Sequence, residues 1–277
     1  MENISSFAPV SVVIPCFNAS LFLSRAVDSV VNQTLLPFQL VMVDDASTDG
    51  GKTRDLIANI EKYIASLNNG MSVKTIFLQK NVGPGGARNR GWNVSTQEWI
   101  AFLDADDSWA VNKLALQYGC LLVNNQIDVL AHRSSFKPSD LDGAQPVTLK
   151  RRLDIQRVSL LKMLVSNTLP TRSILLRREI PLRFPENILS EDYSLWLRII
   201  AAGYDVRLMN CALAFAFRPE YSEGGSSAKL WAQERGELCA FLALHQGNSI
   251  SFLTLLIASS WSILKFTRRY IIRRILG

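Results

Sequence analysis

Short apolar runs alternate with amphipathic stretches along the first hundred residues. Apolar and β-branched residues dominate 10–14, 40–43, 73–78 and 99–103, a pattern typical of strands that are buried on both faces of a sheet. We expect Pro15 to end the first strand, because proline cannot donate to a ladder. Between the runs, apolar residues recur at the i, i+3, i+4 spacing of one helix face. They are Leu23, Ala26, Val27, Val30 and Val31, then Leu56, Ile57, Ile60, Ile64 and Leu67.

This alternation predicts an α/β fold with a Rossmann-like, mostly parallel sheet flanked by helices. After residue 110 the periodicity is less regular. We expect helices over 114–123 and 160–165, a strand at 128–131, a polar loop at 134–146 and an extended segment at 172–176.

Acidic residues follow two of the predicted strands directly. Asp44 and Asp45 come after the second strand, and Asp104, Asp106 and Asp107 come after the fourth. Ligands of such sheets bind beyond the carboxyl ends of the strands. Crowded carboxylates stay ionised more readily beside a hard divalent cation with oxygen ligands. The alternative for the fourth strand is a solvated acidic turn that caps the following helix.

The third strand is followed by the glycine-rich segment 81–91, NVGPGGARNRG. A dinucleotide-binding fingerprint would need glycine at position 88, where the chain has Arg88. Small residues that let the backbone approach a ligand, before a helix carrying Arg88 and Arg90, fit phosphate binding better. On this segment alone, a basic helix turn in water explains the residues equally well.

Glu191 and Asp192 stand at the predicted start of a helix whose apolar face includes Leu195, Ile199 and Ile200. The positive end of the helix would favour the ionised carboxylates. Taken alone, the pair with Ser190 is better explained as an ordinary helix cap.

Five segments taken together resemble family 2 glycosyltransferases of the GT-A fold. VSVVIPCFN, VDDASTDG, NVGPGGARNRG, FLDADD and SEDYSLWLRI occur in that family's order and spacing over about 10–204. The resemblance implies transfer of a hexosyl or N-acetylhexosaminyl group from a nucleotide-diphosphate sugar, with UDP-sugars favoured, to an acceptor hydroxyl. It also implies inversion at the anomeric carbon and a Mn²⁺ or Mg²⁺ ion on the diphosphate.

The same resemblance implies roles for individual residues. Asp106 would be the metal ligand, and Asp104 would reach the nucleoside or a metal-bound water. Asp192 would be the catalytic base, with Glu191 as the alternative. The remaining donor contacts would come from Pro15, Phe17 and Asp45 around the nucleotide, from Arg88 at the base or diphosphate, and from Arg218. Arg218 stands in a segment where many relatives carry a histidine that this chain lacks.

The resemblance divides the chain into a transferase domain over 1–225 and a helical segment over 226–277. The domain would comprise a nucleotide-binding half over about 8–110 and an acceptor half over about 111–225. Residues 246–264 contain no charge, and five basic residues follow them. Because serines dilute this stretch, we expect an interfacial helix on the cytoplasmic face of the inner membrane, peripheral or monotopic. The alternative is a terminal helix packed on the domain or on a second subunit.

Composition narrows the function classes. Apolar residues make up 48% and charged residues 19% of the 277-residue chain, which is rich for a soluble protein but short of a polytopic membrane protein. The four scattered cysteines suggest neither a zinc site nor a disulfide framework. The N-terminus lacks the basic region of a signal peptide. The net charge of +6 includes a basic stretch at 150–183, but without a nucleic-acid-binding motif we expect no nucleic-acid partner.

The leading hypothesis is therefore a transferase that builds bacterial surface polysaccharide on a lipid-linked saccharide acceptor. A catalytically silent nucleotide-sugar-binding or scaffold protein on the same fold is the alternative. The acids at Asp45, Asp104, Asp106 and Asp192 argue against it, because a silent protein has no need of crowded carboxylates.

Overall fold

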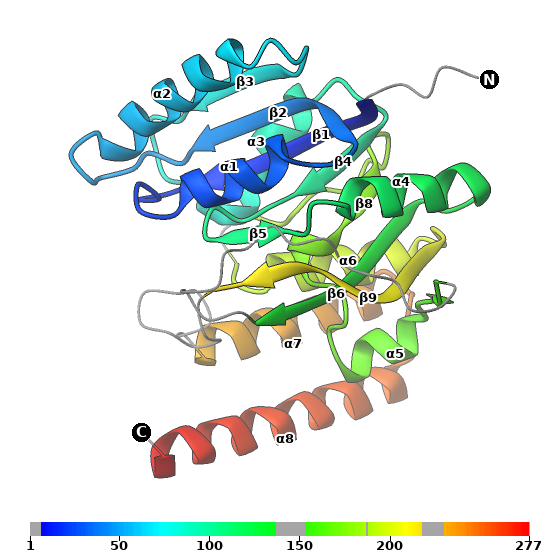
Figure 1. The fold of residues 1–277 in the computed structure, drawn as a ribbon. Helices are drawn as coiled ribbons and strands as arrows, with labels where there is room; N and C mark the ends of the chain where they lie inside the picture. Colours follow the sequence, from blue (N-terminus) through cyan, green and yellow to red (C-terminus); the bar gives the residue numbers. More distant parts are fainter. Residues whose placement is uncertain (1–6, 137–152, 187, 218–229, 277) are drawn as a thin grey trace.

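The computed structural model describes residues 7–136, 153–186, 188–217 and 230–276, and it shows one mixed sheet with helices on both faces (Figure 1). Within those residues the sheet has nine strands in the order β3-β2-β1-β4-β8-β6-β9-β5, with β7 on β9. The strands are β1 (Phe7–Cys16), β2 (Leu36–Asp44), β3 (Ser72–Phe77), β4 (Trp99–Phe102), β5 (Asp107–Trp109), β6 (Val129–Phe136), β7 (Ile155–Arg157), β8 (Leu175–Arg177) and β9 (Val206–Ala216).

The helices agree with the periodicity of the sequence wherever that periodicity is regular. They are α1 (Leu23–Val31), α2 (Lys52–Ser66), α3 (Gly83–Val94), α4 (Lys113–Val123), α5 (Leu160–Val165), α6 (Glu191–Ala201), α7 (Leu230–Gln246), α8 (Phe252–Leu276) and the 3₁₀ turn η1 (Thr171–Ser173). The first four strands pair with one another in parallel, as predicted. The second half of the sheet mixes parallel and antiparallel pairs.

Alternate side chains of the parallel strands enter two separate cores, as expected for a strand buried on both faces. On β1, Val10, Val12 and Ile14 pack with the apolar faces of α1 and α2. Val13 packs on the other side, in a core to which α3, α6 and α7 contribute. This two-sided burial holds the carboxyl ends of β1, β2 and β4 at one edge, from which the acidic loops leave.

Four details differ from the sequence expectations. Pro15 does not end β1: the strand continues to Cys16, with Pro15 opposite Val43 of β2. Proline fits there because β4 pairs with β1 only from Val10 to Val13, so one side of the strand end needs no ladder donor. The segment at 172–176, expected to be extended, begins as the η1 turn, and β6 extends into the expected loop. Neither β5 nor β9 was predicted.

Of the two C-terminal helices, α7 packs on α6 and α8 packs on α7. Gly236 of α7 lies so close to the residue before Ser190 that a Cβ added to it would meet the Leu189 carbonyl oxygen at 1.9 Å. Helix α8 follows α7 and runs beside it (Figure 1), with Ala258, Ser262 and Phe266 buried. None of the helices over the described residues is both long enough and apolar enough to cross a bilayer. The expected domain boundary at 225/226 lies outside the described residues.

Substituting alanine at two helix glycines should change the free energy of unfolding in opposite directions. A Cβ on Gly91 of α3 would meet Val13 Cγ1 at 2.3 Å, whereas a Cβ on Gly119 of α4 would meet nothing within 4 Å. We expect Gly91→Ala to lower the free energy of unfolding by about 1–3 kcal/mol through overpacking. Gly119→Ala should raise it by about 0.5–1 kcal/mol through helix propensity. Denaturant unfolding of both variants measures this, and equal effects would contradict the packing of α3 on β1.

Candidate functional site

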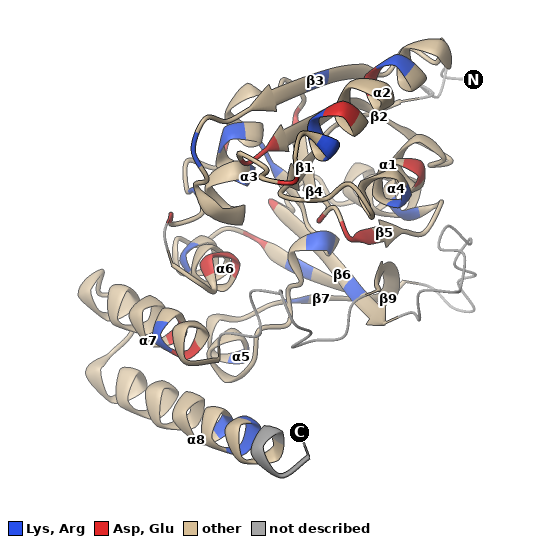
Figure 2. Ribbon diagram, turned by 90° about the vertical axis from the view of Figure 1, so that its left-hand side faces the viewer, with Lys and Arg blue, Asp and Glu red and all other residues tan. Residues whose placement is uncertain are grey.

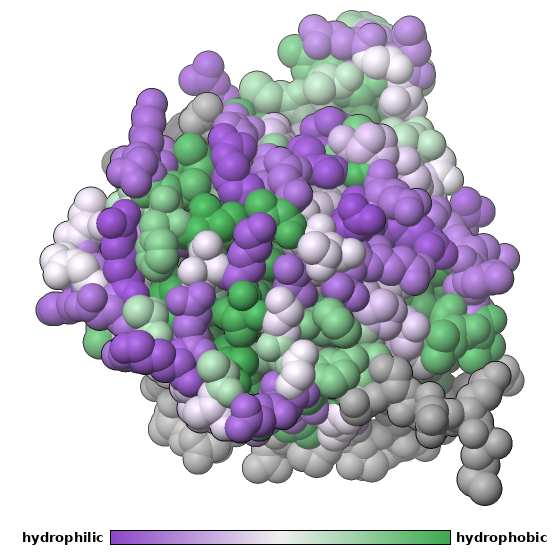
Figure 3. Space-filling view, turned by 90° about the horizontal axis from the view of Figure 1, so that it is seen from above, coloured by the Kyte–Doolittle hydropathy of each residue, from purple (hydrophilic) through white to green (hydrophobic). Residues whose placement is uncertain are grey.

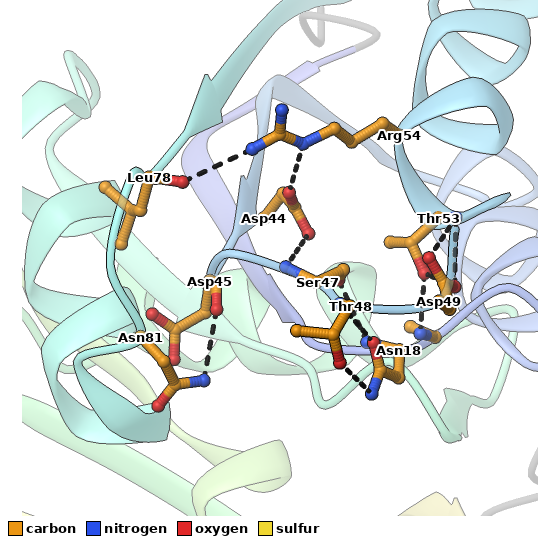
Figure 4. Close-up of polar contacts among 11 residues, drawn as sticks. Asn18, Asp44, Asp45, Ser47, Thr48, Asp49, Thr53, Arg54, Leu78 and Asn81 are labelled. Carbon is orange, nitrogen blue, oxygen red and sulfur yellow. Dashed lines mark hydrogen bonds and ion pairs between the residues drawn. The ribbon is translucent and has the colours of Figure 1, made fainter. Parts of the chain in front are cut away.

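The loop after β2 is tied to the start of α3 by Asp45, which is buried and whose hydrogen bond with Asn81 is drawn in Figure 4. Asp45 Oδ1 accepts a 2.8 Å hydrogen bond from the Val82 N–H, and the Asp45 carbonyl accepts one from Asn81 Nδ2 at 3.0 Å. Burial raises the pKa of Asp45, while the amide donors of Val82 and Gly83 oppose that rise. The side chain predicted to line a nucleotide pocket thus also joins two loops of the candidate site.

A cleft of about 510 Å³ opens beside these loops. Its lining includes Phe17, Thr48, Arg54, Leu78 and Asn81, with the Phe17 ring about half exposed. An exposed ring beside polar side chains and backbone suits a flat base that also carries hydrogen-bonding groups. Pro15 stands two residues before Phe17, so two of the residues predicted to bind nucleotide lie at this end of β1.

Sequence reasoning missed the side chains that shape the rim of this cleft. Asn18 has a φ of 50°, and its side chain both accepts from the Thr48 N–H at 2.8 Å and donates to Thr48 Oγ1 at 3.3 Å (Figure 4). The Asn18 N–H donates to Ser47 Oγ at 2.9 Å. Asparagine tolerates the left-handed backbone conformation better than most residues. An asparagine just after the first strand was therefore the sequence signal that could have indicated this turn.

Arg88 lies at the centre of the site, in the middle of α3 and only 5% exposed. Its Nη2 donates to Asp104 Oδ1 at 2.6 Å, and its Nη1 donates to Glu191 Oε1 at 2.9 Å. Its guanidinium also lies over the Phe184 ring, 5.4 Å from the centroid. These two carboxylates are 16 and 103 positions away in the chain. One buried cation therefore joins the acids after β4 to the acids at the start of α6.

The charges of this cluster shift one another's pKa values. Burial acts to lower the pKa of Arg88, but Asp104 and Glu191 outweigh it and the pKa is raised. Burial acts to raise the pKa of Asp104, but Arg88 outweighs it and the pKa is lowered. The pKa of Glu191 is raised, because its burial outweighs the attraction of Arg88. Asp104 is thus the more firmly ionised partner.

The rest of the acidic loop is held by two further arginines. Arg172 Nη1 donates to Asp107 Oδ2 at 2.5 Å, and Arg25 Nη2 donates to the Asp106 backbone carbonyl at 2.9 Å. Burial raises the pKa of Asp107 to about 7, although Arg172 pulls it down. Sequence reasoning missed both arginines, because a single basic residue on a distant segment carries no periodic or motif signal.

The two acids of α6 have different surroundings. Glu191 is 8% exposed and bonded to Arg88, whereas Asp192 is partly exposed. Asp192 Oδ2 accepts from Thr171 Oγ1 at 2.9 Å, and Asp192 Oδ1 accepts from the Tyr193 N–H at 2.7 Å. Of the predicted site residues, only Arg218 lies outside the described residues.

The carboxylates of this site suit a hard divalent cation only if a bound ligand supplies further oxygen atoms. Within 7–136, 153–186, 188–217 and 230–276, no three His, Cys, Asp or Glu side chains are grouped to hold a metal ion by themselves. Asp104 and Asp107 are engaged with arginines. Mg²⁺ is commonly bound through one or two carboxylates together with substrate phosphates, so Asp106 with a diphosphate fits.

Comparisons with known proteins identify the family of this chain. The model of the family described as "Glycosyl transferase family 2" matches residues 11–179. This match covers more than half of the chain, so the chain belongs to glycosyltransferase family 2.

Relatives and solved structures extend the likeness. An uncharacterized glycosyltransferase of Haemophilus influenzae is 33% identical over 190 residues, 68% of this chain and 70% of the relative. The Escherichia coli UDP-Glc:alpha-D-GlcNAc-diphosphoundecaprenol beta-1,3-glucosyltransferase WfgD is 27% identical over 206 residues, 73% of each chain.

Two solved structures share the GT-A fold. S. aureus TarS in complex with UDP-GlcNAc has a TM-score of 0.64 at 21% identity, over 85% of this chain and 66% of TarS. The Pyrobaculum calidifontis mannosyltransferase PcManGT in complex with GDP-Man and Mn²⁺ also has a TM-score of 0.64, at 17% identity, over 98% of this chain and 76% of PcManGT.

Removing the central arginine should be far more costly than removing its neighbour on α3. Arg88→Leu leaves Asp104 and Glu191 without their buried cation, so we expect the free energy of unfolding to fall by about 3–5 kcal/mol. Arg90→Leu is the control, because Arg90 is 42% exposed in its pair with Glu186, and such pairs contribute about 0–1 kcal/mol. Denaturant unfolding at pH 7 compares them, and similar losses would contradict the central role of Arg88.

Proposed function

We propose that this protein is an inverting glycosyltransferase of bacterial surface polysaccharide synthesis. It moves a hexosyl or N-acetylhexosaminyl group from a nucleotide-diphosphate sugar, with UDP-sugars favoured, to a hydroxyl of a lipid-linked or oligosaccharide acceptor. The observation that carries the proposal is the Arg88 cluster, which joins the donor-side acid Asp104 to the acid pair at the start of α6. WfgD, as its name states, is a UDP-Glc:alpha-D-GlcNAc-diphosphoundecaprenol glucosyltransferase, which supports the choice of a UDP-sugar and a lipid-linked acceptor.

On the donor side, the nucleotide lies in the cleft beside Phe17 and Asp45, and the diphosphate lies at the acids after β4. Asp106 holds Mn²⁺ or Mg²⁺ there together with the diphosphate. A bound cation supplies charge stabilisation to the leaving diphosphate as the glycosidic bond breaks. Binding of Mn²⁺ with GDP-Man by PcManGT supports the cation.

On the acceptor side, Asp192 is the base that takes the proton of the attacking hydroxyl. Inversion requires a base on the face opposite the leaving group. Asp192 is the better candidate of the α6 pair because Glu191 Oε1 is held by Arg88 and its side chain is mostly buried. Asp192 is open enough to meet an acceptor.

Helix α8 attaches the enzyme to the cytoplasmic face of the membrane, which holds the lipid-linked acceptor. Its exposed apolar face comprises Leu253, Leu256, Ile257, Ile263, Leu264 and Ile271. Figure 2 shows basic residues in the C-terminal part of α8, where Arg268 is exposed. An apolar face beside basic residues suits an anionic lipid surface. Over α2 and β3, by contrast, hydrophilic residues separate small apolar areas (Figure 3).

The proposed roles predict that one aspartate substitution weakens nucleotide binding and that another slows donor cleavage. With Mn²⁺ present, Asp106→Asn should weaken UDP binding by at least about tenfold, because it removes a charged metal ligand. Asp192→Asn should bind UDP like wild type but lose about 10²–10⁴-fold in cleavage of the best donor among UDP-glucose, UDP-GlcNAc and GDP-mannose.

Calorimetry and release of nucleoside diphosphate measure these two quantities. Wild-type UDP affinity of Asp106→Asn, with the same Mn²⁺ requirement, would refute the metal assignment. If Glu191→Gln were crippled while Asp192→Asn cleaved donor normally, the base would be Glu191. Failure of the wild type to cleave any of the three donors would count against the proposed function.

The exposed face of α8 predicts binding to anionic vesicles. Wild-type protein should sediment with phosphatidylglycerol-containing vesicles, less so at high salt, and not with phosphatidylcholine vesicles. Ile257→Glu with Leu264→Glu should abolish this, because both charges enter the apolar face. Leu122→Glu with Val123→Glu on α4 is the control, since these side chains are also exposed.

Two results would contradict membrane attachment. One is wild-type protein that stays in the supernatant with both kinds of vesicle. The other is a wild-type dimer without lipid that becomes a monomer on substitution of Ile257 and Leu264, because the face would then belong to a second copy of the chain.

A further inference from the structure

The 3₁₀ turn η1 reaches both acidic parts of the site. Thr171 Oγ1 donates to Asp192 Oδ2 at 2.9 Å, and the next residue, Arg172, pairs with Asp107. Thr171 is 6% exposed, so its hydroxyl faces the carboxylate rather than solvent. None of the five segments that carry the family resemblance includes this turn, and only its last two residues fall in the segment at 172–176 that was expected to be extended.

The turn is held rigidly from several sides. Ser173 Oγ donates to the Pro170 carbonyl at 2.7 Å, inside the turn. From outside, Trp109 Nε1 donates to the Arg172 carbonyl at 2.8 Å and Gln117 Nε2 donates to the Ser173 carbonyl at 3.0 Å. Both of these donors come from buried residues of β5 and α4. Thr171 therefore presents its hydroxyl from a platform that belongs to the core.

Within the described part of the chain, each of the two oxygens of Asp192 receives one hydrogen-bond donor. Oδ2 receives the Thr171 hydroxyl, and Oδ1 receives the Tyr193 N–H at 2.7 Å. A carboxylate has about four lone-pair sites, so both oxygens keep capacity to accept a proton. The backbone donor belongs to the residue next in sequence and moves with α6. Among the contacts of the described residues, the Thr171 hydroxyl is the one that relates the carboxylate to a separate element.

We propose that Thr171 is a positioning residue for the catalytic base Asp192, an inference that rests on the proposed function. Its hydroxyl orients the carboxylate of α6 relative to the acidic loop, which Arg172 of the same turn holds through Asp107. The turn thus sets where the base stands relative to the donor diphosphate. Small errors in such a placement cost rate rather than donor affinity.

The test compares three threonine variants in the donor-cleavage assay with Mn²⁺, using the best donor among UDP-glucose, UDP-GlcNAc and GDP-mannose. Thr171→Val removes the donor hydroxyl and keeps the side-chain shape. Thr171→Ser keeps the hydroxyl. Thr168→Val is the matched control, because Thr168 lies on the same segment and its hydroxyl bonds to Met163 Sδ instead of an acid.

We expect Thr171→Val to lower kcat by roughly ten- to a hundredfold while the KM for donor stays within about twofold. Thr171→Ser and Thr168→Val should stay within about threefold of the wild-type kcat, because they keep the hydrogen bond to Asp192. Water can reach the partly exposed Asp192 in Thr171→Val, so the midpoint of thermal unfolding should shift by less than roughly 4 °C.

Two results would overturn the inference while Asp192→Asn still shows its large loss. One is a kcat of Thr171→Val that equals the kcat of the control Thr168→Val. The other is Thr171→Ser as slow as Thr171→Val, because fit and not the hydroxyl would then matter. Wild-type cleavage by Asp192→Asn is a different failure, because it would remove the base assignment of the proposed function itself.

Discussion

The buried guanidinium of Arg88 is the interaction on which the site depends. A charged group at 5% exposure is tolerated only when hydrogen-bonded opposite charges surround it. Arg88 meets this condition by taking one carboxylate from the loop after β4 and one from the start of α6. Those segments are far apart in the chain, so the requirement to satisfy one cation also fixes the acids after β4 relative to the acids of α6.

The same constraint explains why Glu191 and Asp192, though adjacent, differ so much. Successive helix residues point about 100° apart, so one carboxylate of the pair can turn toward Arg88 while the other faces Thr171. Glu191 becomes part of the buried charge cluster. Asp192 remains partly exposed, with its oxygens oriented by a hydroxyl and a backbone amide. The division of roles between two neighbouring acids therefore follows from what each one touches.

Local patterns predicted the parallel half of the fold, because strands buried on both faces and helices with one apolar face leave periodic signals. Strand β5 left none: its three residues begin with Asp107, which looked like part of a loop, and its partner β9 lies about a hundred positions away. The resemblance indicated which acids to examine, but not their partners. Thr171, Arg172 and Arg25 act through distant contacts that only the folded chain creates.

The close approach of Gly236 to the Leu189 carbonyl leaves no room between α7 and the start of α6 for even one methyl group. Helices α7 and α8 are therefore held firmly against the domain and are not a flexible attachment. If α8 lies on a lipid surface as proposed, its packing through α7 onto α6 holds Asp192 at a constant distance from the headgroups. At a constant distance from the membrane, Asp192 would meet acceptor sugars near the lipid end of a growing chain. Sugars farther from the lipid would then be added by enzymes whose active sites lie farther from the membrane.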